Sequence, residues 1–253
     1  MSEVALIVVG AVATAVVGFI VIRYGPSVER FLGRRAVRAR VELDAVAPRI
    51  ATEADPGMFE AGFPNWEAYG YVFPLGIDEV GIPPTSICRE WREWARPKGG
   101  VDARWTKVQV VVEGRSEGQV LIDRLEIELL GKREPISGTY AFCPVGGASA
   151  SPREIFVRLD DDPPTVRFVE RGDEPVTEFL FTLGQREVET FRVYAVTERH
   201  SCEWIARLSY VANGRRDFIE ISDEGEPFRT TGVRNAEAYA WMTDGWTEYD
   251  VSY

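Results

Sequence analysis

The clearest pattern in the chain is an uncharged apolar run of nineteen residues, from Val4 to Ile22. At about 1.5 Å per residue, a helix of this length measures about 28 Å, close to the thickness of a bilayer core. No basic residue precedes the run and no small-residue cleavage site follows it, which disfavours a signal peptide. We therefore expect a single transmembrane anchor over residues 1–25. A cleaved segment and a hydrophobic helix buried in the protein are the alternatives.

Small residues recur every four positions within this run, at Gly10, Thr14 and Gly18. A face of this kind lets two membrane helices approach closely, so a homodimer through the anchor is one interpretation. The other interpretation is that glycine is simply frequent in membrane helices.

Basic residues follow the apolar run, in a segment over 26–43 whose apolar positions favour a juxtamembrane helix. We expect Arg30, Arg34, Arg35 and Arg38 to face anionic lipid there, so the lipid bilayer is the first expected partner. Basic flanks stay on the cytoplasmic side of a membrane. The pattern therefore predicts a single-pass protein of the cell membrane with a short exterior N-terminus and a cytoplasmic C-terminal domain.

Prolines, glycines and aromatic residues dominate the next segment, 44–104. Proline at this density disfavours a long helix or a central strand, and the aromatic content disfavours a free linker. We expect an extended arm that packs onto the body and contains a short helix at 85–96. Trp91 and Trp94 share one face of that helix, and we expect them to pack against a sheet rather than bind a ligand.

From residue 105 to 232 the pattern changes to an alternation with a period of two, as in the run of Val108, Val110 and Val112. About nine short strands separated by turn residues predict a mainly β fold. The expected architecture is an antiparallel β-sandwich of the Ig-like or jelly-roll-like kind.

Two local signals refine this β domain. The phase of the alternation changes near Asp123-Arg124, which predicts a β-bulge. Asn213-Gly214 between two strand-like runs predicts a hairpin turn. One strand face is expected to point into the core, and its members are Cys202, Trp204, Ala206, Leu208 and Tyr210.

The C-terminal segment, 233–253, is rich in acidic and aromatic residues. Asn235 is suited to cap one or two helical turns. We expect this tail to wrap the sandwich. The alternative is a docking peptide for a basic partner.

The formal net charge of −11 is unevenly distributed. Residues 1–43 carry six arginines against three acidic residues, so the rest of the chain carries −14. Such a body lacks the basic face that phosphate contacts need, which excludes nucleic acid as an expected partner. Three cysteines are too few and too widely spaced for a disulfide framework, although a Cys143–Cys202 pair stays open and would argue for an exterior body.

Few residues offer catalytic or metal-binding chemistry. His200 and Cys202 share a strand face, but a zinc site usually needs three or four such ligands. The aspartates at 160–162 suit either a calcium site or, more commonly, a solvated turn. The run 147–151 lacks the closing glycine of a nucleophile elbow. We therefore assign no catalytic, cofactor-binding or metal-ligating residue and expect no cofactor.

Several stretches of the chain occur together in a recognisable set: Cys88–Gly100, Leu121–Gly138, Cys202 with Trp204, Asn213-Gly214, and Pro227-Phe228. The set resembles an uncharacterised actinobacterial family with an N-terminal membrane helix and a C-terminal β-rich domain. The resemblance covers about residues 85–232. It implies that architecture and transfers no activity or site residue to this chain.

Together these patterns predict a membrane-anchored β-sandwich that acts as a binding or protein-interaction module without catalytic activity. An unidentified protein is the expected partner besides the bilayer. The alternative is a carboxylate-based hydrolase tethered to the membrane, because acidic residues are numerous enough to supply a catalytic pair. A further alternative places the domain at the outer face of the membrane.

Overall fold

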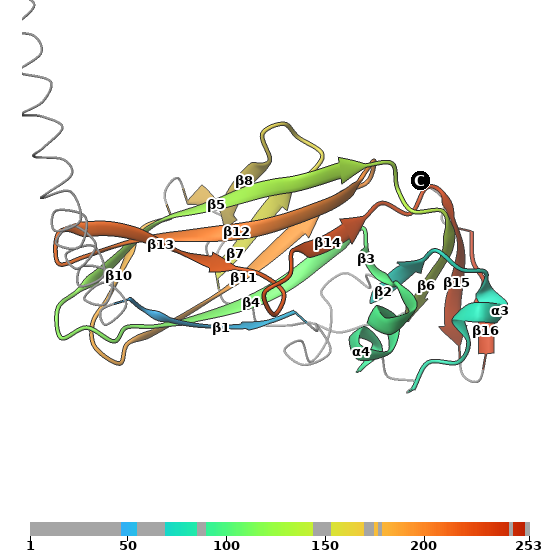
Figure 1. The fold of residues 1–253 in the computed structure, drawn as a ribbon, viewed down its shortest axis with the longest axis horizontal. Helices are drawn as coiled ribbons and strands as arrows, with labels where there is room; N and C mark the ends of the chain where they lie inside the picture. The colour runs from blue at the N-terminus through green and yellow to red at the C-terminus, as the bar shows by residue number, and fades with distance from the viewer. Residues whose placement is uncertain are drawn as a thin grey trace, which may run out of the picture. The chain divides into compact units, whose positions relative to one another are not determined.

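The computed structural model describes residues 47–54, 69–84, 90–143, 153–169, 175–176, 179–242 and 245–250. The chain divides into two units, Met1–Val46 and Ala47–Tyr253, and every described residue belongs to the second (Figure 1). Within the described ranges, no helix has the length and apolar character needed to cross a membrane. The residues predicted to act at the membrane lie outside these ranges, namely Val4–Ile22 with Gly10, Thr14 and Gly18, and the segment 26–43 with Arg30, Arg34, Arg35 and Arg38.

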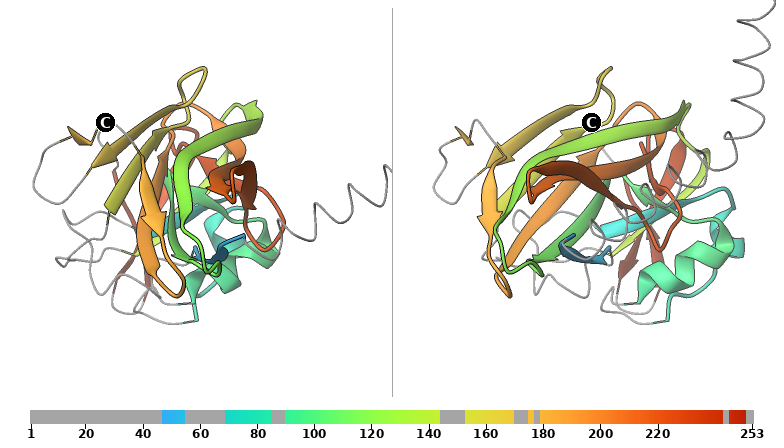
Figure 2. Two further views of the ribbon diagram at one scale, coloured as in Figure 1. Left: turned by 90° about the vertical axis from the view of Figure 1, so that its left-hand side faces the viewer. Right: turned by 60° about the vertical axis from the view of Figure 1, so that its left-hand side comes forward.

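The second unit is mainly β and has two sheets, which confirms the predicted fold class at this level and is consistent with a β-sandwich (Figures 1 and 2). The first sheet has six strands in the order β1-β4-β11-β7-β8-β9. Its strands are β1 (Arg49–Glu53), β4 (Trp105–Glu113), β11 (Val188–Val196), β7 (Arg153–Arg158), β8 (Thr165–Val169) and β9 (Pro175–Val176).

The second sheet has ten strands in the order β10-β5-β12-β14-β3-β2-β6-β15-β16, with β13 paired to β12 outside this path. Its strands are β10 (Phe181–Leu183), β5 (Val120–Arg133), β12 (Ser201–Ala212), β14 (Phe228–Thr231), β3 (Val101–Ala103), β2 (Tyr69–Phe73), β6 (Gly138–Cys143), β15 (Ala236–Met242), β16 (Gly245–Glu248) and β13 (Arg215–Ile221).

The alternating strands bury one face, as their pattern predicts. Val108, Val110 and Val112 of β4 are almost fully buried. On β12, the predicted inward face is confirmed, because at most 2% of the surface of any member is exposed: Cys202, Trp204, Ala206, Leu208 and Tyr210. Burial of such apolar faces is a main source of hydrophobic stabilisation.

Two predicted irregularities of the second sheet are confirmed. The register between β12 and β5 shifts between Ser209 and Tyr210, which leaves Asp123 as the extra residue of the bulge. Asn213 and Gly214 join β12 to β13 with φ angles of 50° and 71°. These left-handed conformations are those of a two-residue hairpin turn.

The prediction of purely antiparallel pairing was wrong. Among the described strands, three pairs are parallel: β11 with β7, β14 with β3, and β15 with β6. Alternation determines which face of a strand is buried, but it carries no information on the direction of the neighbouring strand. That direction depends on the long connections between strands, such as the one that brings β15 back to β6.

The segment expected to form an extended arm packed on the body contributes β2 and β3 to the interior of the second sheet. β2 lies between β3 and β6, and all five of its residues are buried. A central strand is compatible with this sequence because Pro64 and Pro74 lie outside β2 and leave its N–H groups free to pair. Part of the segment 44–104 therefore belongs to the sheets, as β1, β2 and β3.

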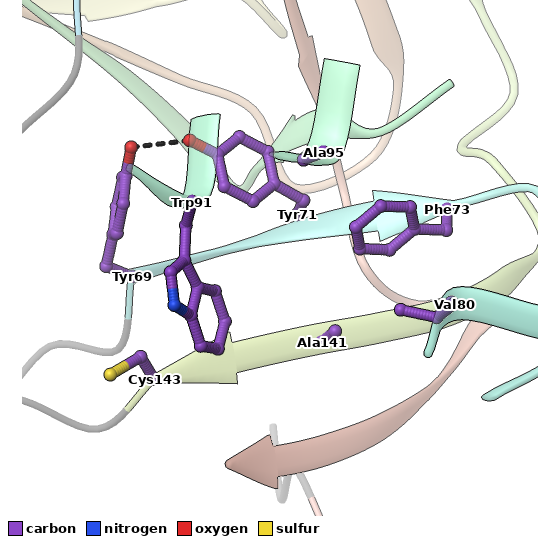
Figure 3. Packing of buried hydrophobic residues seen from close by; sticks show 8 residues of the cluster. All are labelled: Tyr69, Tyr71, Phe73, Val80, Trp91, Ala95, Ala141 and Cys143. Atoms are coloured by element: carbon purple, nitrogen blue, oxygen red, sulfur yellow. Dashed lines mark hydrogen bonds between the residues drawn. The ribbon is translucent and has the colours of Figure 1, made fainter. Parts of the chain in front are cut away.

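Short helical segments accompany these strands, namely α3 (Ile77–Val80), α4 (Trp91–Ala95) and the 3-10 helix η2 (Arg96–Lys98). Part of the helix predicted at 85–96 falls on residues 85–89, outside the described ranges. Trp91 is fully buried beside Tyr69 and Tyr71 (Figure 3), which confirms the packing role predicted for it. The ring centroid of Trp94 lies 5.3 Å from that of Phe73.

The C-terminal segment packs on the body as strands, and the helical turn predicted at Asn235 was wrong. β15 pairs with β6, and β16 pairs with β15. The ring centroid of Trp246 lies 5.9 Å from that of Trp91, and its Nε1 donates a hydrogen bond to the carbonyl of Gly81 (2.9 Å). For the residues described up to 250, these contacts favour the wrapped tail over the free docking peptide.

The cysteines do not form the pair that the sequence left open. Cys143 is disulfide-bonded, whereas Cys202 is a free and fully buried thiol. A Cys143–Cys202 bond is therefore ruled out. Cys143 ends β6 and belongs to the buried cluster around Trp91 (Figure 3). Cys88, the third cysteine, lies outside the described ranges.

Candidate functional site

A cleft of about 570 Å³ lies beside α4, and we refer to it as the α4 cleft. Its walls come from α4, η2, β2, β3, β12, β14 and the turn between β13 and β14. Its size falls within the range of small-ligand sites, about 300–1,000 Å³. The lining residues are Tyr71, Arg92, Arg96, Gly100, Val101, Asp102, Glu203, Asp223, Glu224, Glu226, Pro227 and Arg229.

Two glycines turn the chain from η2 into β3 and place α4 close to the sheet. Gly99 has a φ of 76° and donates its N–H to the carbonyl of Arg96 (3.0 Å). Gly100 donates to the carbonyl of Ala95 (2.9 Å), and a Cβ at this position would lie 2.9 Å from the ring of Phe73. Glycine at position 100 therefore permits the close approach that the cleft geometry requires.

Arg92 extends from α4 into the floor of the cleft, with 8% of its surface exposed. Its Nη1 donates to the carbonyl of Ala54 (2.8 Å) and lies 3.4 and 3.5 Å from the carboxylate oxygens of Asp102 on β3. Its Nη2 donates to Oδ2 of Asp223 (2.6 Å), after β13. Arg92 therefore joins parts of the chain that are far apart in the sequence, through hydrogen bonds strengthened by charge. We refer to this set of contacts as the Arg92 network.

A tight turn positions Asp223 for this contact. Its two central residues, Glu224 and Gly225, have φ angles of 55° and 94°. The residues that flank them, Asp223 and Glu226, exchange backbone hydrogen bonds of 2.7 and 3.0 Å. Arg96 also donates to the carboxylate of Asp223, and its Nη1 lies 3.4 Å from Glu224. Two guanidinium groups thus converge on one carboxylate at the floor of the cleft.

Hydrogen bonds continue from this floor into the core of the domain. Oδ2 of Asp102 accepts a hydrogen bond from the Thr106 hydroxyl (2.7 Å). Because that donation uses the only hydroxyl proton of Thr106, the hydroxyl of Thr230 donates to Thr106 (2.6 Å). Thr230 in turn accepts from Nε1 of Trp204 (2.9 Å). Thr106, Thr230 and Trp204 are fully or almost fully buried, so the chain of hydrogen bonds ties the cleft to the packed interior.

The rim of the cleft differs from its floor. Glu226 and Arg229 are exposed, and within the described ranges neither side chain has a hydrogen-bond or ion-pair partner. The floor charges are paired with one another, while the rim charges are free to meet a ligand. The arrangement is therefore equipped to hold a polar ligand by its charged groups.

A second polar cluster surrounds Asp160, in the loop between β7 and β8. Its Oδ1 lies 2.8 Å from Nδ1 of His200 and accepts a hydrogen bond from the hydroxyl of Thr197 (2.8 Å). Its Oδ2 accepts from the backbone N–H groups of Glu198 (2.8 Å) and Arg199 (3.2 Å). Asp160 therefore caps the turn between β11 and β12.

These contacts change the acidity of the cluster. Burial alone would raise the pKa of Asp160, but the hydrogen bonds from Glu198, His200, Thr197 and Arg199 outweigh it and lower the pKa to about 2. Burial raises the pKa of the Cys202 thiol. Cys202 is fully buried, so it packs as a small apolar residue and does not present a reactive thiolate.

The metal sites considered from the sequence are not formed by this cluster. Both oxygens of Asp160 are engaged by the turn, and His200 bonds to Asp160 while Cys202 faces the core. Within the described ranges, no three His, Cys, Asp or Glu side chains are grouped to hold a metal ion. The run 147–151 lies outside those ranges.

Sequence reasoning did not find the residues of the α4 cleft. Arg92 and Asp102 are ten positions apart, and Arg92 and Asp223 are 131 positions apart. One local signal was present, because Arg92 lies beside Trp91 on a helix whose tryptophan face was expected to be buried. A buried arginine needs an acidic partner, but nothing in the sequence indicates which carboxylate it is.

No protein-family model matches the chain, and no curated protein matches it either.

Substitution of Asp160 tests the role of the second cluster. The folded pKa of about 2 lies below the ordinary value of 3.8, so the stabilisation is present above pH 4 and is lost as the pH falls towards 2. We expect Asp160→Asn to lower the free energy of unfolding by about 2 kcal/mol at pH 7. This deficit shrinks between pH 4 and pH 2 in urea titrations followed by tryptophan fluorescence.

Asp162→Asn is the matched control, because Asp162 is exposed in the same loop. It is expected to leave the free energy of unfolding within about 0.5 kcal/mol of the wild type. A deficit for Asp160→Asn that stays constant down to pH 2 contradicts the capping role.

Proposed function

We propose that this protein is a membrane-anchored binding module without catalytic activity, and that its ligand binds in the α4 cleft. The observation that carries the proposal is the Arg92 network, which holds the cleft walls together through bonds to Ala54, Asp102 and Asp223. A site whose walls are ordered before the ligand arrives loses little conformational entropy on binding. The cleft thus has the preorganisation that a binding module needs.

The carboxylates of the cleft support binding over hydrolysis. Asp102 and Asp223 are the most buried acidic residues of the lining, and both are in contact with Arg92. A hydrolytic pair needs carboxyl groups that are free to exchange a proton with the substrate. Asp102 and Asp223 are instead engaged by hydrogen bonds from Arg92, so these side chains are suited to position the cleft walls.

Position-specific photocrosslinking tests whether the cleft is the binding site. Full-length protein that carries benzoylphenylalanine in place of Glu226, at the exposed rim, is expected to form an adduct with a partner in native membranes. The matched control carries the same group in place of Glu117, which is exposed in the loop between β4 and β5. That loop adjoins the hairpin end of β12, whereas the cleft adjoins its opposite end.

An adduct specific to position 226 supports the proposal. Equal yields from the two positions, or no adduct from either, contradict it. Hydrolysis of a substrate panel that is lost in Asp102→Asn would favour the hydrolase instead.

We also propose that Val4–Ile22 anchors the protein as a single-pass helix with the body in the cytoplasm. The arginines that follow the run support this orientation. The disulfide of Cys143 supports the opposite orientation, because disulfides persist in oxidising compartments. The number of free cysteine thiols in cells distinguishes a cytoplasmic body from an exterior one.

With a cytoplasmic body, all three cysteines are expected to be thiols in cells. Full-length protein alkylated under denaturing, non-reducing conditions then gains three labels, counted by mass spectrometry. The Cys202→Ser variant is the matched control and loses one label, since Cys202 is free in either case. A single label on the wild type, located on Cys202, overturns the cytoplasmic assignment.

A further inference from the structure

We infer that the α4 cleft binds a cationic group, the side chain of a lysine or arginine presented by a partner protein. This inference rests on the proposed function, because it takes the cleft as the binding site and adds the class of ligand. It is supported by the charge balance of the lining, by the engagement of its arginines, by the open acidic rim and by the apolar part of the walls.

Carboxylates outnumber guanidinium groups in the cleft. The lining holds five acidic residues, against Arg92, Arg96 and Arg229 as its basic members. A concave surface with one sign of charge in excess raises the local concentration of the opposite charge. The acidic body, with −14 outside residues 1–43, adds to this attraction over a longer range.

The arginines at the floor are already engaged by the protein itself. Arg92 donates to Ala54, Asp102 and Asp223, and Arg96 donates to Asp223 and Glu224. An incoming anion would have to displace these carboxylates from both guanidinium groups. The floor therefore does not offer an anion site, even though it contains arginines.

The acidic residues of the rim, Glu226 and Glu203, are in contrast accessible to a ligand. Glu226 is exposed and unpaired within the described ranges. Glu203 lies 3.4 Å from Arg133, but 73% of the Arg133 side chain is exposed. Exposed ion pairs contribute little free energy, so a cation from a ligand can replace Arg133 at small cost.

Apolar groups in the lining fit the rest of a long basic side chain. Tyr71, Val101 and Pro227 contribute to the walls together with the carboxylates. Lysine and arginine carry an apolar stem and a charged head, and they bury the stem along apolar surface. A lysine or arginine side chain therefore fits both the apolar walls and the carboxylates of the cleft. A compact inorganic cation fits only the carboxylates.

Arg229 provides the sharpest test, because it is exposed and adds a positive charge to the same lining. A bound cation is attracted by Glu226 and repelled by Arg229. Removal of the Glu226 charge should therefore weaken binding of the cation, and removal of the Arg229 charge should strengthen it. Neither side chain contributes to the Arg92 network, so neither substitution is expected to disturb the fold.

The experiment uses the full-length chain in neutral detergent at an ionic strength of about 0.15 M, with binding measured by calorimetry. The cationic probe is acetyl-Gly-Arg-Gly-amide, and its neutral counterpart carries citrulline in place of arginine. Inorganic phosphate is the anionic probe. Glu117→Gln and Arg115→Gln are the matched controls, because both residues are exposed in the β4–β5 loop and change the net charge by the same amounts.

We expect the arginine peptide to bind and the citrulline peptide and phosphate not to bind. Glu226→Gln should weaken binding of the arginine peptide about two- to fivefold, and Arg229→Gln should strengthen it by a similar factor. The two control substitutions should change the affinity by less than about 1.5-fold, because charges far from the site are screened.

Equal binding of the arginine and citrulline peptides overturns the inference, as does phosphate binding that Arg229→Gln weakens. Control substitutions that act as strongly as those at the rim also overturn it, because they would show attraction to the whole acidic body rather than to the cleft. If position 226 crosslinks a partner while the arginine peptide does not bind, the ligand class is wrong and the proposed function stands. If both experiments are negative, both proposals fail.

Discussion

The buried guanidinium group of Arg92 is the interaction on which the candidate site depends. A charge removed from water is costly unless it is paired and hydrogen-bonded, and Arg92 meets this requirement with Ala54, Asp102 and Asp223. The compensation fixes the position of α4, which is only five residues long and has little stability of its own. The aromatic rings packed around Trp91 also contact this helix.

The contact between Asp102 and Thr106 extends this constraint into the second sheet. Through Thr230 it reaches Trp204, on the face that β12 buries. The floor of the cleft is therefore coupled to the packed core, whereas Glu226 and Arg229 at the rim are exposed to solvent. This division explains how one site combines a rigid framework with charges that are free to meet a ligand.

Local patterns in the sequence were sufficient for the features that depend on neighbouring residues. The inward face of β12, the bulge at Asp123 and the Asn213-Gly214 turn were all predictable because each follows from alternation or from backbone preference. The parallel pairs and the central place of β2 depend on which distant strands meet, and alternation does not encode this. The candidate site was missed for the same reason. Asp160 was correctly placed in a turn, but its partners at Thr197 and His200 lie on another loop.

The free energy of unfolding of Arg92→Met, compared with that of Arg96→Met, tests the central role of Arg92 most directly. Only 10% of the Arg92 side chain is exposed, whereas 38% of the Arg96 side chain is exposed. We predict a loss of about 3–5 kcal/mol for Arg92→Met, because Asp102 and Asp223 are left without their buried partner, and less than about 1 kcal/mol for Arg96→Met. Adding Asp102→Asn to Arg92→Met should recover part of the loss. Equal and small losses for the two arginine variants would contradict the account.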